Sequence, residues 1–443
     1  MDLLEKVAAA GVIGAGGAGF PTHVKLNTNS EFVLLNGAEC EPLLRVDQQL
    51  MTVYPEEIVK GLLISLQITG AAHAIVGIKK SHPEVIEIME KAILNIDNAS
   101  EFVKVAALPD VYPAGDEQVL VYELTGRIVP ETDIPISVGC VVINSETAYN
   151  IWKAEQDLPV TEKFVTVTGD VPNPNTVKVP VGTPLIELFS AAGRPDLNGY
   201  AVINGGPMMG PLLTDEDRYV TKTTKGLIVL PENHSLIVKK RRSMDKAVYV
   251  NRSACEQCTI CTDLCPRHLL GHSTVPHKMV RAVIYNHPAN ESMTSALTCC
   301  QCNLCEYFSC PAGINPRMAN TFYAEKLQEQ GIKHRKKEDF KVNFLRDYRQ
   351  IPSRRLIQRL GLARYDVSAK LNENPNVSLN YVGIGLKDHV GAPAVPCVSI
   401  GDLVSKGQKI ALPSSGALGA IVHASIDGKV EAIENNLILI RSE

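Results

Sequence analysis

Cys255-Glu-Gln-Cys258-Thr-Ile-Cys261-Thr-Asp-Leu-Cys265-Pro266 is the stretch that decides the fold, because nine of the twelve cysteines lie between its first residue and Cys310. Its spacing, C-x2-C-x2-C-x3-C-P, is typical of chains that hold two [4Fe–4S] clusters. The first three thiolates bind one cubane, and the cysteine before proline ligates the other. The stretch therefore predicts one cluster here and a second cysteine run elsewhere.

The second run is Cys299-Cys300-Gln-Cys302-Asn-Leu-Cys305-Glu-Tyr-Phe-Ser-Cys310-Pro311. If Cys299 is the first ligand, the run reproduces the spacing C-x2-C-x2-C and Cys300 binds no iron. Cys300 in place of Cys299 as the ligand is the open alternative. Zinc is the alternative metal. Zinc sites, however, normally use two pairs of cysteines separated by a dozen or more residues, and they do not need a third cysteine three positions after a pair. We expect one cluster on Cys255, Cys258, Cys261 and Cys310, and the other on Cys299, Cys302, Cys305 and Cys265.

Length and composition exclude several classes of protein. A chain of 443 residues is too long for one ordinary core, so several domains are expected. The net charge of −4 argues against nucleic acid as the main partner. No apolar run approaches the roughly 18 residues of a membrane span, and Asp2 and Glu5 lie where a signal peptide would be basic. We therefore expect a cytoplasmic protein whose thiols stay reduced and bind metal.

The order of patterns predicts a multidomain α/β protein. Residues 1–158 alternate helices, near 3–10, 55–68 and 84–94, with strands at 32–36, 74–78 and 140–144. Four further units are expected: a hairpin-plus-helix domain at 159–238, an α-helical two-cluster domain at 239–330, a helical, basic linker at 331–375, and a small β-barrel or sandwich at 376–443.

The remaining charged stretches and isolated cysteines have simple interpretations. The basic stretches Lys239–Arg242 and His334–Lys337 are expected to be solvated linkers, with docking of an acidic partner or a shell protein as the alternative. Cys140 and Cys397 are expected to be buried thiols.

A glycine-rich loop, Gly14-Ala-Gly16-Gly17-Ala-Gly19, formally contains G-x-G-x-x-G. The dinucleotide fingerprint requires a preceding strand and a following helix, whereas here a helix precedes the loop and Pro21 follows it closely. Successive backbone N–H groups in such a loop can still cradle a phosphate.

The loop is the first of four segments that resemble, in order, the flavin site of the FMN- and NADH-binding subunit of respiratory complex I and of the RnfC protein of Rnf complexes. The segments are GAGGAGFPTHVK from residue 14, Asn36-Gly-Ala-Glu39-Cys40-Glu41-Pro42, Tyr112-Pro-Ala-Gly115-Asp116-Glu117 and Val142-Ile-Asn144-Ser145-Glu146-Thr147. The resemblance implies FMN as a cofactor and NADH as the electron donor.

The same resemblance assigns residues to the flavin. Gly14, Gly16, Gly17 and Lys25 would hold the phosphate and ribityl chain, while Asn36, Glu39, Asn144 and Ser145 would lie along the ring and ribityl groups. Tyr112, Gly115, Asp116, Glu117 and Thr147 complete the implied site. Two departures stand out: Asp116 replaces the usual glutamate, and the phenylalanine-rich nicotinamide surface of complex I is not evident in a chain with nine Phe.

Domain order sharpens the resemblance. Residues 159–238 look like the β-grasp module, of SLBB type, that follows the flavin domain in these proteins. The C-terminal region resembles the barrel-sandwich module that RnfC proteins carry at their N-terminus. This permuted order closely resembles the microcompartment-associated cobalamin reductases. The chain is thereby identified as an iron–sulfur flavoprotein oxidoreductase.

The resemblance implies electron transfer from NADH through FMN and two clusters to a corrinoid, in 1,2-propanediol utilisation. The alternative is an Rnf-like relay protein that passes electrons to a protein partner. A microcompartment shell, an adenosyltransferase partner and a location inside a microcompartment are further implications. No D-x-H-x-x-G corrinoid motif occurs in the chain, so a corrinoid would be met at the surface.

Overall fold

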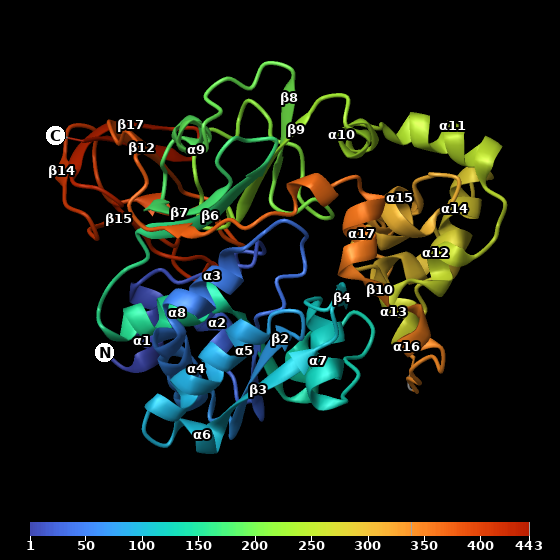
Figure 1. Cartoon of the computed structure of the whole chain (residues 1–443), viewed down its shortest axis with the longest axis horizontal. Helices are drawn as coiled ribbons and strands as arrows, with labels where there is room; N and C mark the ends of the chain where they lie inside the picture. The colour runs from blue at the N-terminus through green and yellow to red at the C-terminus, as the bar shows by residue number, and fades with distance from the viewer. Residues whose placement is uncertain (338, 443) are drawn as a thin grey trace.

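A computed structural model of the chain describes residues 1–337 and 339–442 (Figure 1). A parallel sheet of order β3-β2-β1-β5 forms the core of the N-terminal unit. Its strands are nearly continuous apolar runs because side chains pack on both faces of a parallel sheet. The three strands expected from the sequence are confirmed. The strands are β1 (Phe32–Asn36), β2 (His73–Lys79), β3 (Val103–Leu108) and β5 (Cys140–Asn144), with a short β4 (Val111–Tyr112) outside the sheet.

Helices flank this sheet, and the longest has clear start and stop signals. Helix α4 begins with Pro55 in its first turn and ends at Gly70, whose φ is 65°. It approaches α8 so closely that a Cβ on Gly61 would lie 1.9 Å from the Ala148 carbonyl oxygen. Only glycine fits there. The helices are α1 (Leu3–Ala9), α2 (Thr22–Leu26), α3 (Val46–Val53), α4 (Pro55–Thr69), α5 (Pro83–Asn95), α6 (Ala99–Phe102), α7 (Glu117–Thr125), η1 (Pro135–Val138) and α8 (Ser145–Glu155).

The second unit is a five-stranded sheet of order β11-β7-β6-β9-β8, with one helix between β7 and β8. Strand β6 pairs antiparallel with β7 and parallel with β9. Its edge strand β11 comes from far along the chain, so the linker contributes to this sheet. The elements are β6 (Glu162–Gly169), β7 (Asn175–Pro180), α9 (Leu185–Ala191), β8 (Tyr200–Asn204), β9 (Gly226–Pro231) and β11 (Leu371–Asn372).

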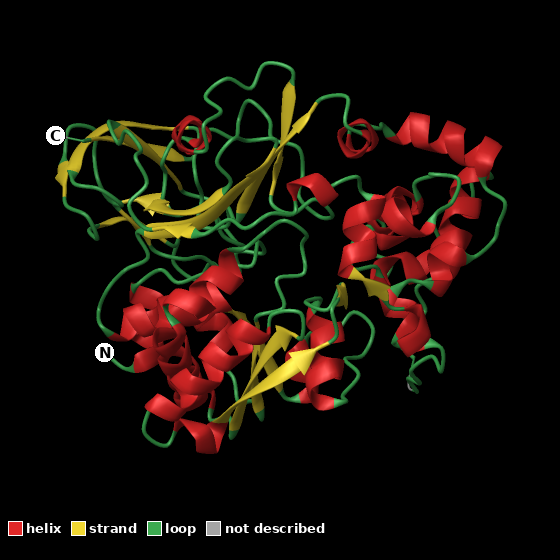
Figure 2. Ribbon diagram, in the orientation of Figure 1, coloured by secondary structure: helices red, strands yellow, loops and turns green. Residues whose placement is uncertain are grey.

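The cysteine-rich unit is helical (Figure 2). Both cysteine runs lie in loops that lead into short helices, and the longer helix α14 lies between the two runs along the chain. The elements are α10 (Ser235–Lys240), α11 (Met244–Ala254), α12 (Ile260–Asp263), α13 (Pro266–Leu269), α14 (Pro276–Ile284), η2 (Glu291–Thr298), η3 (Cys305–Ser309) and α15 (Pro316–Glu329).

The first basic stretch is not a solvated linker, so that prediction is wrong. Lys239 donates to the Glu306 carbonyl oxygen at 2.6 Å, and Lys240 donates to the Gly210 carbonyl oxygen at 2.6 Å. These lysines satisfy backbone acceptors at the boundary between the second unit and the cysteine-rich unit. Their charges therefore join two units of the chain itself.

The linker also differs from the expectation. Among the described residues 331–337 and 339–345 there is no helix, and the basic stretch there contacts the N-terminal unit: His334 Nε2 lies 2.7 Å from Glu131. Further on, Ile351 pairs with Tyr112 in a two-stranded ladder. The expected helical structure is therefore found only in the later part of the linker, from residue 346 onward. The linker elements are α16 (Arg346–Arg349), β10 (Ile351–Pro352), α17 (Ser353–Arg359) and η4 (Ala363–Tyr365).

The C-terminal unit consists of two antiparallel sheets, β12-β18-β17-β14 and β13-β15-β16, around one apolar core. Cys140 is buried, as expected, but Cys397 is exposed, which corrects the expectation of a buried thiol. The strands are β12 (Tyr381–Gly385), β13 (Val395–Pro396), β14 (Leu403–Val404), β15 (Lys409–Leu412), β16 (Val422–His423), β17 (Gly428–Glu434) and β18 (Leu437–Arg441).

The C-terminal unit packs back on the start of the chain, and both termini lie on the same side of the molecule (Figure 1). The Val390 N–H donates to the Gly19 carbonyl oxygen at 3.0 Å. Lys222, from the second unit, donates to the carbonyl oxygens of Gly11 at 2.8 Å and Ile421 at 3.2 Å, so three units meet there. No helix in the described part of the chain has the length and apolar character to cross a membrane.

Candidate functional site

A cavity of about 760 Å³ opens at the carboxyl ends of β1 and β5. Because β1 lies between β2 and β5, this is the point where the strand order reverses, the usual ligand site of an open α/β sheet. Of the residues that the sequence assigns to a flavin, Ser145 alone does not line it. The lining includes Gly14, Gly16, Gly17, Lys25, Asn36, Glu39, Tyr112, Gly115, Asp116, Glu117, Asn144 and Thr147.

Ser145 lies behind the wall of this cavity. It is fully buried, and its hydroxyl has no hydrogen-bond partner among the described residues.

The glycine loop connects α1 to α2. The helix before the loop is the one expected from the sequence, whereas the short helix α2 (Thr22–Leu26), which begins directly after Pro21, was not expected. The Gly14 N–H donates to the Phe20 carbonyl oxygen at 2.9 Å, and the Ala15 N–H donates to Thr147 Oγ1 at 3.0 Å. Gly17 has a φ of 110° and faces open space, where a Cβ would meet nothing within 4 Å. Among the described residues, the N–H groups of residues 16–18 have no acceptor. Free N–H groups beside an open space fit an anionic phosphate.

Two charged residues flank this loop. Lys25 and Glu117 both line the cavity, and Lys25 Nζ lies 2.9 Å from Glu117 Oε1. Both side chains are partly exposed. The lysine can therefore turn from this carboxylate to a phosphate at little cost, since an exposed ion pair contributes roughly 0–1 kcal/mol.

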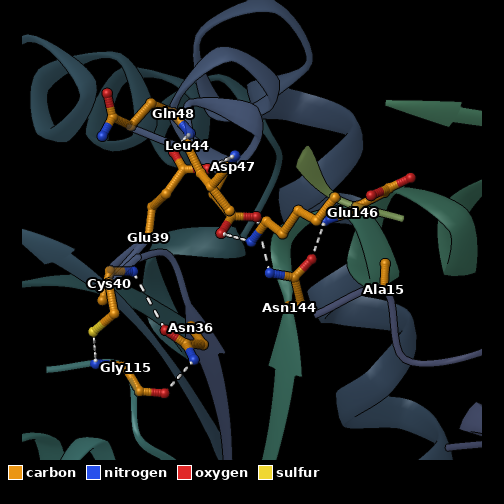
Figure 3. A network of polar contacts seen from close by, with 12 residues as sticks. Ala15, Asn36, Glu39, Cys40, Leu44, Asp47, Gln48, Gly115, Asn144 and Glu146 are labelled. Carbon is orange, nitrogen blue, oxygen red and sulfur yellow. Dashed lines mark hydrogen bonds and ion pairs between the residues drawn. The ribbon is translucent and has the colours of Figure 1, made fainter. Parts of the chain in front are cut away.

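A short polar chain joins the end of β1 to the segment at Gly115 (Figure 3). Asn36 Nδ2 donates to the Gly115 carbonyl oxygen at 2.8 Å, and the Gly115 N–H donates to Cys40 Sγ at 2.6 Å. Burial raises the pKa of the Cys40 thiol to about 11. Cys40 thus belongs to the cavity wall, a role that sequence reasoning did not assign even though the residue lies inside a segment matching the flavin family.

A second polar network organises the far wall (Figure 3). Glu39, with a φ of 38°, accepts from the N–H groups of Asp47 at 3.0 Å and Gln48 at 3.1 Å, and so caps α3. Burial, and then the charge of Asp47, raise the pKa of Glu39 to about 7. Asp47 in turn pairs with Lys225 and accepts from Asn144 Nδ2 at 2.8 Å. The wall therefore holds a carboxyl group that titrates near neutrality.

The cysteine-rich unit closes the cavity. Cys300 and Cys302 line it directly. The Tyr112 hydroxyl donates to the Cys302 carbonyl oxygen at 2.8 Å. Asp116 Oδ2 lies 2.8 Å from Arg267, in the helix that follows Cys265. The flavin-type cavity and the second cysteine run therefore share a wall.

The cysteines form two groups. Burial raises the pKa of Cys261 to about 12, and the charges of Cys310, Cys258 and Cys255 contribute to the rise, so these four thiols lie close together. Cys310 thus lies beside the first run, although it belongs to the second in sequence.

Cys265, in turn, lies beside the second cysteine run, although it belongs to the first run in sequence. Burial, and then the charges of Cys299 and Cys265, raise the pKa of Cys305. Burial, and then the charge of Cys300, raise the pKa of Cys265. Cys300 itself lies beside Cys302 and Arg267. Each group thus offers enough thiols for a four-iron cubane. Within the described residues, no three His, Cys, Asp or Glu side chains form a site for a single metal ion.

Comparison with known proteins agrees with this architecture. Four family models match in order: the Nuo51 FMN-binding domain over residues 7–153, the SLBB domain over 164–212, the 4Fe-4S dicluster domain over 254–315 and the RnfC barrel sandwich hybrid domain over 374–443. The chain is thus an FMN- and [4Fe–4S]-type oxidoreductase of multidomain α/β fold.

Whole-chain relatives give the family. The chain is 44% identical over 441 residues to cobalamin reductase PduS of Citrobacter freundii, covering 99% of this chain and 96% of the relative. It is 43% identical, with the same coverage, to cobalamin reductase PduS of Salmonella typhimurium. One component of the Na(+)-translocating ferredoxin:NAD(+) oxidoreductase complex of Acetobacterium woodii is 35% identical over 275 residues, which cover 60% of this chain and 58% of that component. The chain therefore belongs to the cobalamin reductase PduS family.

Proposed function

We propose that the chain passes electrons from NADH through FMN and two [4Fe–4S] clusters to a corrinoid. The observation that carries this proposal is the shared wall: Cys300 and Cys302 line the cavity, and Tyr112 is hydrogen-bonded to the cysteine loop. A bound flavin converts a two-electron donor into single-electron steps, which is what iron–sulfur centres carry. The chain's part is to hold both kinds of centre close together.

Within this proposal, the cavity residues have separate tasks. The free N–H groups of residues 16–18 and Lys25 bind the phosphate, while Asn36, Asn144 and Gly115 fix the edge of the ring. Glu39 titrates near neutrality, so it can exchange a proton when the charge in the cavity changes. Ser145 is fully buried outside the cavity lining, and its hydroxyl has no partner among the described residues, so we assign it no direct contact with the flavin.

The two cysteine groups also differ in position. The group with Cys299, Cys302, Cys305 and Cys265 includes a residue of the cavity wall, and its Cys265, Cys302 and Cys305 are buried. In the other group, Cys258 is exposed. We assign the first group as the flavin-side centre and the second as the exit centre, from which electrons leave to a corrinoid met at the surface.

The test is an anaerobic titration of the purified protein with NADH, followed by flavin absorbance and EPR, and then with cob(III)alamin or cob(II)alamin added. We expect flavin bleaching, then reduction of both centres, then corrinoid reduction without a further protein. Flavin reduction that never reaches either centre would contradict the electron path. Failure with corrinoids alongside turnover of artificial acceptors would contradict the corrinoid assignment.

A second candidate is a relay to a protein partner, as in the related Rnf complexes. It is favoured by the surface around the exit centre, where Tyr249 is 75% exposed, Tyr285 is 65% exposed and Ile260 is 37% exposed. Rates that depend on an added ferredoxin-like or adenosyltransferase partner, but not on free corrinoid, would identify it. Location inside a microcompartment belongs to the same proposal, and co-purification with shells tests it.

A further inference from the structure

Arg267 occupies an unusual position between the cavity and the second cysteine group. It lies in α13, two residues after Cys265, and its side chain is only 11% exposed. Its guanidinium contacts Asp116 Oδ2 at 2.8 Å. The other oxygen of Asp116 accepts from the N–H groups of Gln118 at 3.1 Å and Val119 at 3.2 Å, so the same carboxylate also caps α7.

On its other side the guanidinium approaches the cysteines. Arg267 lies close enough to Cys299 and Cys300 for its charge to act on both thiols, and its Nε has no protein acceptor among the described residues. An arginine stays protonated at any working pH. A permanent positive charge with one carboxylate partner and a free N–H group is therefore buried beside the loop that holds Cys299, Cys302 and Cys305.

The positive charge of Arg267 would change the reduction potential of a cluster bound by these cysteines. Adding an electron makes a cluster more negative, and a nearby buried cation stabilises the reduced form because screening is weak away from water. Cluster potentials are set in part by such charges and hydrogen bonds around the sulfurs.

We propose that Arg267 is a positioning residue that raises the reduction potential of the flavin-side centre, and that Asp116 sets the size of this effect by partly neutralising it. The inference rests on the proposed function. It also accounts for the aspartate at position 116, where the flavin family has a glutamate. The shorter side chain of Asp116 caps α7 with one oxygen and contacts Arg267 with the other.

The experiment is a redox titration with dithionite and mediators, followed by EPR on the anaerobic full-length protein, so that neither NADH nor a corrinoid is needed. In Arg267→Gln, the ratio of reduced to oxidised flavin-side centre at a fixed potential should fall about tenfold. For a one-electron centre, this corresponds to a reduction potential that is lower by ~59 mV. The exit centre should not move. Arg267→Lys should shift the same centre less. Asp116→Asn should shift it upward, because the cation loses its counter-charge.

Arg194→Gln is the matched control. Arg194 also pairs with one aspartate, Asp170 at 3.2 Å, and also has an unpartnered Nε among the described residues, but it belongs to the second unit away from the cysteines. It should leave both potentials unchanged.

The opposite signs separate an electrostatic role from a structural one. If Arg267→Gln loses iron, Arg267→Lys and Asp116→Asn must still shift one centre in opposite directions. Equal shifts of both centres, shifts of the same sign, or no shift would overturn the proposal. Absence of two centres in the unmodified protein would instead contradict the proposed function.

Discussion

The hydroxyl of Tyr112 in the flavin-type unit lies 2.8 Å from the carbonyl oxygen of Cys302 in the second cysteine run. This bond crosses between two units that are far apart in sequence. It fixes the cysteine loop against the cavity, and the distance between redox centres depends on such contacts.

Tyr112→Phe should remove this bond and leave a buried carbonyl unpaired, at about 1–3 kcal/mol. We expect a lower melting temperature and, after rapid mixing with NADH, slower transfer of electrons from the reduced flavin to the flavin-side centre, measured relative to the rate of flavin reduction in the same variant. Tyr249→Phe, at an exposed tyrosine, is the control. Unchanged cluster reduction in Tyr112→Phe would show that the bond does not position the loop.

Cys265→Ala and Cys310→Ala should each cost one cluster, because each cysteine ligates with the three thiols of the other run. Iron analysis should fall from about eight to about four per chain. Cys300→Ala should keep the full iron content. Loss of a cluster in the Cys300 variant would instead favour Cys300 over Cys299 as the ligand.

The buried pair of Lys163 and Glu146 joins the second unit to α8, and each side chain is 1% exposed. Lys163→Met should destabilise the protein by about 3–5 kcal/mol, because it leaves an uncompensated buried carboxylate. Adding Glu146→Gln should restore part of the loss. Lys91→Met, at the exposed Glu87 pair, should cost under about 1 kcal/mol in denaturant unfolding. Equal losses for the two lysine variants would contradict this account.

Gly11 has a φ of 65°, and a Cβ there would lie 2.2 Å from the Ile421 carbonyl oxygen. Gly11→Ala should therefore cost more than the ~1–2 kcal/mol of the left-handed conformation alone. Gly126 has a φ of 72° with nothing within 4 Å, so Gly126→Ala reports the conformational cost without the clash. A smaller loss of melting temperature at Gly11 than at Gly126 would be inconsistent with the packing described.

Burial lowers the pKa of Lys222 from 10.5 to about 8. Between these values the unfolded chain holds a proton that the folded chain does not, so the free energy of unfolding should rise as pH rises from about 8 to 10.5. It should rise by at most about 3–4 kcal/mol. Lys222→Met should flatten this dependence in denaturant titrations; a slope unchanged in the variant would assign it to another group.

Much of the fold follows from local patterns. Buried strands such as 32–36 and 140–144 are apolar runs of the right length, and the cysteine spacing fixes the chemistry of the second half. The four flavin segments meet at one cavity because two of them follow β1 and β5, whose carboxyl ends lie at the same edge of a parallel sheet.

Contacts between units were beyond sequence reasoning. Lys239 and Lys240 bind backbone carbonyl oxygens. Because every residue has a carbonyl group, the sequence does not indicate which ones accept these hydrogen bonds. The ladders of β10 and β11 are two residues long each, too short to produce a pattern. Arg267 meets Asp116 only because two units dock, although its place after Cys265-Pro266 is a signal worth testing in similar chains.

The hydrogen bond from Val390 to Gly19 also bears on how the protein is made. The glycine loop makes most of its contacts within the N-terminal unit, but this bond can form only after residue 390 has been synthesised. On the ribosome, this last contact of the glycine loop can therefore form only after both cysteine runs have emerged. We expect iron–sulfur assembly to be able to precede flavin loading during biosynthesis, and chains interrupted before residue 376 to lack a stable flavin loop.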